Sequence, residues 1–423
     1  DLNTGKYWKY AYDKLGQLQY ATEYAANGTG QKRYKYYYDH AGNLTSWRIE
    51  DGAATNTQEE HTYTYGDSNW KDLLTAFDGK AITYDANGNP TKYYNGGTMT
   101  WRNGRQLASY SLGGKTYRYE YDVNGLRTRK SNADGGYTEY YIIDGLAVAE
   151  RRYYSGGGVQ YTLRYLYDES NNPVGFGMQY PNSTRWTNYY FEKNVQGDVI
   201  GVYQKEGDGN SATHILAARY SYDPYGNPTS MTNGAGTAVS QTSNTIAAIN
   251  PFRYRGYRYD GDTGLYYLQS RYYDPEVGRF LNVDSVLGGN DSLLSFNLFA
   301  YCGNNPINRI DPTGQSFIAI AGLAALVGGI IFGCTGSSSV TAAEKTPIDP
   351  SVPPPPSSGY VPPKKNPNPG KVPNPNGSGK GWPSEGGGVW VPDNKQHGGP
   401  GWTEQFPGGK HKHHYPDGHV REV

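Results

Sequence analysis

The chain has 423 residues with 39 basic and 39 acidic side chains, so its formal charge is zero. This balance weighs against a protein that binds nucleic acid or acidic membranes through the charge of its whole surface. Two cysteines exclude a disulfide framework, and 43 tyrosines and 57 glycines beside three methionines do not describe a helix-packed globule.

Residues 1–250 contain a recurring Tyr-Asp phrase, which in most copies precedes a Gly-Asn or Gly-Leu pair. Aromatic and polar residues alternate before most copies, which is the period of a half-buried strand. The Asp, Asn and Gly that follow supply turn chemistry. The sequence therefore predicts a mainly β chain, a ribbon of hairpins whose irregular spacing argues against a strict propeller or solenoid. Copies stand at Tyr12-Asp13, Tyr38-Asp39, Tyr84-Asp85, Tyr121-Asp122, Tyr167-Asp168 and Tyr222-Asp223.

Residues 251–314 close the repeat region with a longer motif. It runs from Phe252-Arg253-Tyr254-Arg255-Gly256 through Arg271-Tyr272-Tyr273-Asp274-Pro275 and Gly278-Arg279-Phe280 to Asp311-Pro312-Thr313-Gly314. With the upstream repeats, this motif resembles the end of the core of Rhs/YD-repeat proteins. The resemblance implies a β-ribbon spiralling into part of a hollow shell that encloses a toxic C-terminal domain, which bacteria deliver to competitors.

The same resemblance implies partners and a location. The expected partners are secretion machinery and a cognate immunity protein. The protein is expected to be secreted or on the cell surface, and its toxin module to be delivered to a target cell. The chain begins at Asp1 in the middle of a repeat phrase. We therefore expect a C-terminal part of a longer protein, for which a missing export signal means little.

In some family members the closing region also cuts its own chain as an aspartyl protease. That chemistry needs two carboxylates close enough that one holds a proton while the other activates water. By resemblance the pair is Asp284 and Asp311, with Arg279 as a nearby charge partner, and the cut falls shortly after Gly314.

Two residues depart from the family pattern for this self-cleavage. Ser285 stands where a proline usually follows the first aspartate, and Gln315 stands where the signature usually ends in leucine. The alternative is that both aspartates are turn residues, with Pro312 fixing a rigid corner that ends the sheet.

Residues 315–345 are an apolar segment in which residues 317–333 reach the lower length limit of a membrane span. We expect a helix that lies against the inside of a shell, because the run is short and rich in glycine. The other hypothesis is a segment that contacts the target-cell membrane during toxin entry. Residues 346–385 are rich in Pro, Gly and Ser and are predicted to be an extended linker.

Residues 386–423 form a His-rich C-terminal module. Gly and Pro exclude long helices, and short strands are predicted around Trp390, Trp402 and Tyr415. The phrase His-Gly-Gly-Pro-Gly-Trp at 397–402 resembles the type 37 class of polymorphic toxins. Five of the eight histidines lie in this module: His397, His411, His413, His414 and His419.

The chemistry suggested for this module is phosphodiester cleavage, which makes nucleic acid the expected substrate and the module a nuclease. Two neutral histidines can act as base and acid in metal-free RNA cleavage. We expect His397 with His411 or His413 to be this pair, with Lys410 or Lys412 stabilising charge on the phosphate.

A metal-assisted route is the alternative for this chemistry. His411 and His413 share one face of a strand and could join His397 or Asp417 in holding a divalent metal that activates water. Trp402 could stack a base in either case. The plainer hypothesis is a solvated His-rich tail that binds metals adventitiously.

A different class of function is a cell-surface adhesin or carbohydrate-binding repeat protein without catalytic activity. Tyr-rich sheets are compatible with sugar binding. An adhesin, however, has no need of a terminator followed by a tail of foreign composition.

Overall fold

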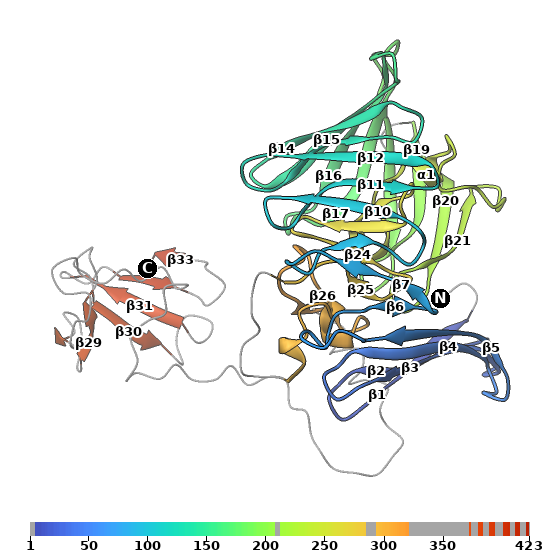
Figure 1. Cartoon of the computed structure of the whole chain (residues 1–423). Coiled ribbons are helices and arrows are strands. Elements are labelled where there is room, and N and C mark those ends of the chain that lie inside the picture. Colours follow the sequence, from blue (N-terminus) through green and yellow to red (C-terminus); the bar gives the residue numbers. More distant parts are fainter. Residues whose placement is uncertain are drawn as a thin grey trace. The chain divides into compact units, whose positions relative to one another are not determined.

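The computed structural model describes residues 5–207, 212–284 and 293–320, and six later segments at 372–373, 380–383, 389–393, 401–406, 411–414 and 420–422. The chain forms two compact units, Asp1–Val327 and Gly328–Val423. The described part is almost entirely antiparallel β-structure (Figure 1), which confirms the predicted mainly β fold.

The first unit is a ribbon of hairpins: within each of its sheets, every strand pairs with the next strand in sequence. A seven-stranded sheet holds β1 (Tyr7–Tyr12), β2 (Leu18–Tyr24), β3 (Gly30–Tyr38), β4 (Leu44–Asp51), β5 (Thr57–Thr64), β6 (Ala76–Phe77) and β7 (Lys80–Ala81). A fourteen-stranded sheet holds β8 (Thr83–Tyr84), β9 (Pro90–Lys92), β10 (Thr98–Arg102), β11 (Gln106–Leu112), β12 (Lys115–Tyr121), β13 (Arg127–Ser131), β14 (Tyr137–Ile143), β15 (Leu146–Tyr153), β16 (Val159–Tyr167), β17 (Pro173–Gln179), β18 (Thr187–Lys193), β19 (Val199–Glu206), β20 (Thr213–Tyr222) and β21 (Pro228–Asn233).

The predicted turn chemistry is confirmed at the repeat phrase, for which Asp39 is representative. Its Oδ1 accepts the backbone N–H groups of Ala41 at 2.9 Å and Asn43 at 2.8 Å, and its Oδ2 accepts the Asn43 side-chain amide at 3.0 Å. Gly42 closes the turn at φ +78°, a conformation that a side chain would strain. The aspartate thus fixes the turn, and the turn fixes which strands pair.

The tyrosine of the repeat phrase has a second role, which the sequence did not reveal. In five of the six copies named above, its hydroxyl donates to a backbone carbonyl in an earlier part of the ribbon and so ties the hairpin to the preceding chain. These bonds are Tyr38 to Leu18 at 2.8 Å, Tyr84 to Leu74 at 3.0 Å, Tyr121 to Leu107 at 3.0 Å, Tyr167 to Ala147 at 2.6 Å and Tyr222 to Val199 at 2.7 Å.

α1 (Ile246–Ile249) precedes the closing region, which forms a small sheet of its own. Its strands are β22 (Arg258–Asp260), β23 (Leu265–Leu268), β24 (Arg271–Asp274) and β25 (Arg279–Phe280), with short 3-10 turns at Tyr254–Gly256, Leu293–Phe296 and Tyr301–Asn304. Figure 1 shows β24 and β25 with ribbon strands on either side. Tyr254, Tyr266, Tyr273 and Tyr301 are at most 1% exposed and form the centre of the larger aromatic core.

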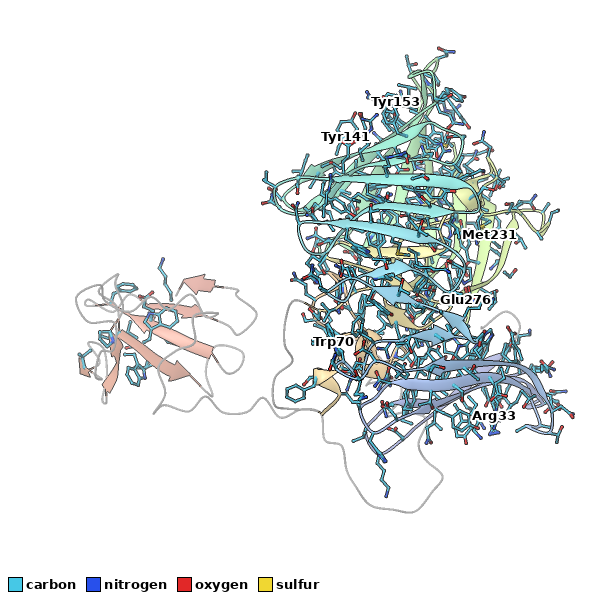
Figure 2. All side chains as sticks on the ribbon, in the orientation of Figure 1. Arg33, Trp70, Tyr141, Tyr153, Met231 and Glu276 are labelled. Atoms are coloured by element: carbon cyan, nitrogen blue, oxygen red, sulfur yellow. The ribbon has the colours of Figure 1, made fainter. Side chains whose placement is uncertain are left out.

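A second buried cluster lies within the ribbon, between β16–β21 and α1, and includes Met231, which is labelled in Figure 2. Buried charges then join the closing region to the ribbon: Arg258 to Glu150 at 2.7 Å, Arg255 to Asp198 at 3.0 Å, and Asp260 to Arg127 at 2.5 Å and to Lys130 at 3.3 Å. The closing region is therefore held by ion pairs as well as by aromatic packing.

The apolar segment begins differently from the expected helix. Ile318–Ala319 is a short strand, β27, paired with β26 (Arg309–Ile310), because the chain after the corner at Asp311 turns back along that strand. The remainder of the apolar run lies outside the described residues. No helix among the described residues is both long and apolar enough to cross a membrane.

The described strands of the second unit form one antiparallel sheet in sequence order. They are β28 (Val372–Pro373), β29 (Lys380–Pro383), β30 (Val389–Asp393), β31 (Gly401–Gln405), β32 (His411–His414) and β33 (Val420–Glu422). The strands predicted around Trp390 and Trp402 are confirmed, whereas Tyr415 lies outside the described residues. β28 and β29 fall within the stretch predicted as a linker, so the sheet starts earlier than expected.

Candidate functional site

Asp311 forms the corner that ends the closing region. Its side chain is 3% exposed, and its Oδ1 accepts backbone N–H groups from Gly314 at 2.8 Å, Gln315 at 3.2 Å and Ser316 at 3.3 Å. The Asp311 N–H donates to the Tyr257 hydroxyl at 2.9 Å. The turn interpretation of Asp311 therefore holds, but its second carboxylate oxygen is engaged elsewhere.

Arg271 on β24 joins the two aspartates that the sequence singled out. Its Nη2 lies 2.7 Å from Asp284 Oδ2 and 3.4 Å from Asp311 Oδ2. Its Nε donates to the carbonyl oxygen of Gly314, and its Nη1 donates to the Leu298 carbonyl at 3.0 Å. The guanidinium group of Arg271 therefore contacts both carboxylates and the Gly314 carbonyl, close to the expected cut.

Burial and neighbouring charges shift the pKa values of Arg271 and Asp311. Burial lowers the pKa of Arg271 to about 10 against the attraction of both carboxylates. Burial also raises the pKa of Asp311, while Arg271 lowers it and the nearby Asp284 carboxylate raises it further. A second cation, Arg105, interacts with Asp284 and donates to the Val283 carbonyl at 3.0 Å. The raised pKa of Asp311 favours its protonated form, and aspartyl chemistry needs one protonated carboxyl.

The cation that contacts Asp284 and Asp311 is Arg271 and not the predicted Arg279. Arg279 is buried on β25 with Nη1 donating to Asn43 at 3.0 Å and to the Tyr65 hydroxyl at 3.0 Å, and Nη2 donating to the Asp72 carbonyl at 2.8 Å. It fastens the closing region to the first sheet. Both arginines belong to the same motif, so only the three-dimensional contacts distinguish them.

Two histidines of the C-terminal module occupy one face of its sheet at the level of the backbone. His413 is opposite Thr403 on β31 and Arg421 on β33, and His411 is opposite Gln405. Alternate residues of a strand lie on the same face. The expectation that His411 and His413 share a face is thus confirmed.

Lys412 belongs to the other face of that sheet, between Glu404 and Glu422. Lys412 therefore does not share a face with His411 and His413, as it would have to if it stabilised charge on the phosphate. Trp402 is opposite His414, also on the other face.

His397, Lys410 and Asp417 lie outside the described residues, so their predicted roles stay predictions. Within the described ranges, no group of three or more His, Cys, Asp or Glu side chains is arranged to hold a metal ion. The sequence did not single out Arg271 within the closing motif, because its contacts with Asp284 and Asp311 are long-range.

The bacterial toxin 37 family matches residues 344–418. The tRNA3(Ser)-specific nuclease WapA of Bacillus spizizenii is 32% identical over 327 residues, which are 75% of this chain and 12% of that protein. Toxin subunit YenC1 of Yersinia entomophaga is 30% identical over 297 residues, 66% of this chain and 28% of the relative. The chain therefore spans only a small part of either relative.

Among solved structures, a chain in the crystal structure of TcdB2-TccC3-Cdc42 shares the fold with a TM-score of 0.55 and 22% identity, over 73% of this chain and 15% of that chain. The Tyr-Asp hairpins, the closing signature and the His-rich module agree with these similarities. The chain is thus similar to the YD-repeat toxins in its repeat region, and its residues 344–418 match the bacterial toxin 37 family, as the resemblance to Rhs/YD-repeat polymorphic toxins led us to expect.

Proposed function

We propose that this chain is a nuclease toxin of interbacterial competition, in which the YD-repeat ribbon carries a C-terminal module that cleaves phosphodiester bonds. One observation carries the proposal: the toxin 37 match covers the segment in which His411 and His413 share a face of the sheet. The tRNA nuclease activity named for the WapA relatives supports nucleic acid as substrate and favours RNA.

The chemistry follows from two imidazoles near neutral pH. One neutral histidine takes the proton of an RNA 2′-hydroxyl while its oxygen attacks phosphorus, and a protonated histidine gives a proton to the departing 5′-oxygen. The products are a 2′,3′-cyclic phosphate and a free 5′-hydroxyl. The candidates for the pair are His411 and His413, with His397 as the partner expected from the sequence.

The test uses the full 423-residue chain with an RNA and a DNA oligonucleotide of the same sequence, in the presence of a chelator. We expect cleavage of RNA alone, and loss of at least ~10²-fold in rate for His411→Ala or His413→Ala. His414→Ala is the matched control, because it removes a neighbouring histidine from the opposite face. A wild-type chain that leaves both polymers intact, with or without Mg²⁺ or Mn²⁺, contradicts the proposal.

The metal-assisted alternative has a distinct signature in the same assay. Cleavage would stop in the chelator, return with a divalent cation, and extend to DNA, because a metal-activated water does not need a 2′-hydroxyl. Either outcome keeps the nuclease proposal and decides between the two mechanisms.

A second function, self-cleavage after the closing region, is favoured by the contacts of Arg271 with Asp284, Asp311 and the Gly314 carbonyl. The raised pKa of Asp311 favours its protonated form, and Arg271 donates to the Gly314 carbonyl, which lies close to the expected cut. Intact-mass measurement of the full chain over time should show two fragments divided shortly after Gly314.

Asp284→Asn and Asp311→Asn should each abolish these fragments. Asp122→Asn, an aspartate of an exposed hairpin turn, is the control and should cut like wild type. A single full-length mass after long incubation of the wild type contradicts self-cleavage and leaves Asp311 as a structural corner.

The delivery of the module is part of the same proposal. We infer export by secretion machinery, action inside a target cell, and a cognate immunity protein in the producer. Expression of the full chain in bacteria should arrest growth, His413→Ala should relieve the arrest, and so should co-expression of the small protein encoded next to the toxin. Growth without arrest would favour the adhesin alternative.

A further inference from the structure

The sheet of the C-terminal module places a cation beside the histidine face. In the row across the sheet, Val391, Thr403, His413 and Arg421 are consecutive cross-strand neighbours on β30, β31, β32 and β33. Directly opposed residues of an antiparallel pair have Cβ atoms about 5 Å apart. Arg421 therefore stands next to His413 on the same face of the sheet.

The cations on the two faces of this sheet have different neighbours. On the opposite face, Lys412 has a carboxylate on each side, Glu404 on β31 and Glu422 on β33. In the described strands, the row that contains Arg421 has no acidic residue. Asp393 shares that face, but it belongs to the next row and to β30, three strands away.

Two residues in the rows that contain His411 and His413 are buried. Thr403, the neighbour of His413 on β31, is 4% exposed, and Val389, in the row of His411, is 8% exposed. Electrostatic interactions are stronger beside surface from which water is excluded, so a cation next to such residues favours an anion. An arginine fork fits two oxygens of a phosphate group. A phosphodiester brought to His413 would supply the charge that the row lacks.

We propose that Arg421 binds the scissile phosphate of the substrate, holding its non-bridging oxygens while His413 transfers a proton. This inference rests on the proposed nuclease function. In the step, the bond from the 2′-oxygen to phosphorus forms and the bond from phosphorus to the 5′-oxygen breaks. One histidine takes the 2′-hydroxyl proton and another donates to the 5′-oxygen, while Arg421 stays protonated throughout. Arg421 lies beyond residues 344–418, the stretch matched by the toxin family.

The test compares Arg421→Gln, Arg421→Lys and the control Lys412→Gln in the full chain, with RNA cleavage and binding of inorganic phosphate as separate readouts. Loss of one preorganised donor to a developing anion lowers kcat by about 10²-fold, so we expect this loss in Arg421→Gln with partial recovery in Arg421→Lys. Phosphate binding, followed by calorimetry, should weaken at least ~10-fold in Arg421→Gln. Lys412→Gln should stay close to wild type in both assays.

A second variant distinguishes the loss of a bound guanidinium from misfolding of the module. Arg421→Gly should regain part of its activity when free guanidinium is added at millimolar concentration, which a merely unfolded module would not do. An Arg421→Gln chain that cleaves RNA and binds phosphate like wild type overturns the inference while the nuclease proposal stands. Conversely, a wild-type chain that cuts no RNA but binds phosphate through Arg421 refutes the nuclease proposal and leaves the anion site.

Discussion

Replacing Asp260 by asparagine is the sharpest test of how the closing region is held to the ribbon. Asp260 Oδ2 lies 2.5 Å from Arg127 Nη1, and Oδ1 lies 3.3 Å from Lys130 Nζ. The three side chains are 4%, 0% and 6% exposed, respectively. Asparagine keeps the shape and removes the charge, so Arg127 becomes a buried cation without its carboxylate and Lys130 keeps only Asp262, at 3.2 Å.

Two independent arguments give the folding free energy that Asp260→Asn should lose. Removing one partner of a buried ion pair costs about 3–5 kcal/mol of folding free energy. Although burial acts to raise it, Arg127 and then Lys130 lower the pKa of Asp260 from 3.8 to about 2, which corresponds to about 2 kcal/mol of favourable interaction with the ionised form. Because this pKa is depressed, the stabilisation is present above about pH 4 and is lost as the pH falls through about 2. We expect Asp260→Asn to lose about 3 kcal/mol at pH 7.

Urea unfolding of the full chain, followed by tyrosine fluorescence, measures this loss. Asp122→Asn is the matched control, since Asp122 follows Tyr121 as Asp260 follows Tyr259 in the same Tyr-Asp phrase. Its Oδ1 accepts two backbone N–H groups at 2.9 Å that an amide oxygen can still accept, so its loss should stay below about 1 kcal/mol. Equal losses for the two variants would refute the argument that buried charge fastens the closing region.

Three further predictions concern other parts of the first unit. Burial, and to a smaller extent the Glu276 carboxylate, raises the pKa of Asp274 to about 7. A raised carboxyl pKa stabilises the fold at low pH, and this stabilisation is lost as the pH rises through about 7. Asp274→Asn should therefore raise the Tm at pH 8 and not at pH 4. Tyr167→Phe removes the 2.6 Å bond to the Ala147 carbonyl and should cost about 1 kcal/mol in urea unfolding, whereas Tyr180→Phe, at a 56% exposed residue, should cost nothing measurable. Gly314→Ala puts a side chain on a residue at φ +73°, with its Cβ 2.7 Å from the Leu268 carbonyl oxygen; it should slow the appearance of self-cleavage fragments in intact-mass spectra, and an unchanged rate would mean that the Gly314 carbonyl is not held for cleavage.

The hairpins could be predicted because their determinants are local. Asp39, Gly42 and Asn43 lie within five residues of one another and define the turn by their own hydrogen bonds. The strands around Trp390 and Trp402 were predictable for the same reason. Alternation also sufficed to put His411 and His413 on one face.

The remaining features depend on residues that are distant in sequence. Arg271 and Arg279 lie in one motif, and what separates them is that Arg271 meets Asp284 and Asp311 across the fold. Ile318 stands near the start of the apolar run that predicted a helix, yet its pairing with β26 makes it part of a strand. The position of Arg421 beside His413 likewise requires the register of β32 and β33.

The most direct test of the central claim is the state of RNA in bacteria that express the full chain. Total RNA extracted after growth arrest should contain fragments ending in 2′,3′-cyclic phosphate, and these fragments should be absent with His413→Ala and present with His414→Ala. Intact RNA in arrested wild-type cells would contradict the claim that the His-rich module kills by cleaving nucleic acid through metal-free histidine chemistry.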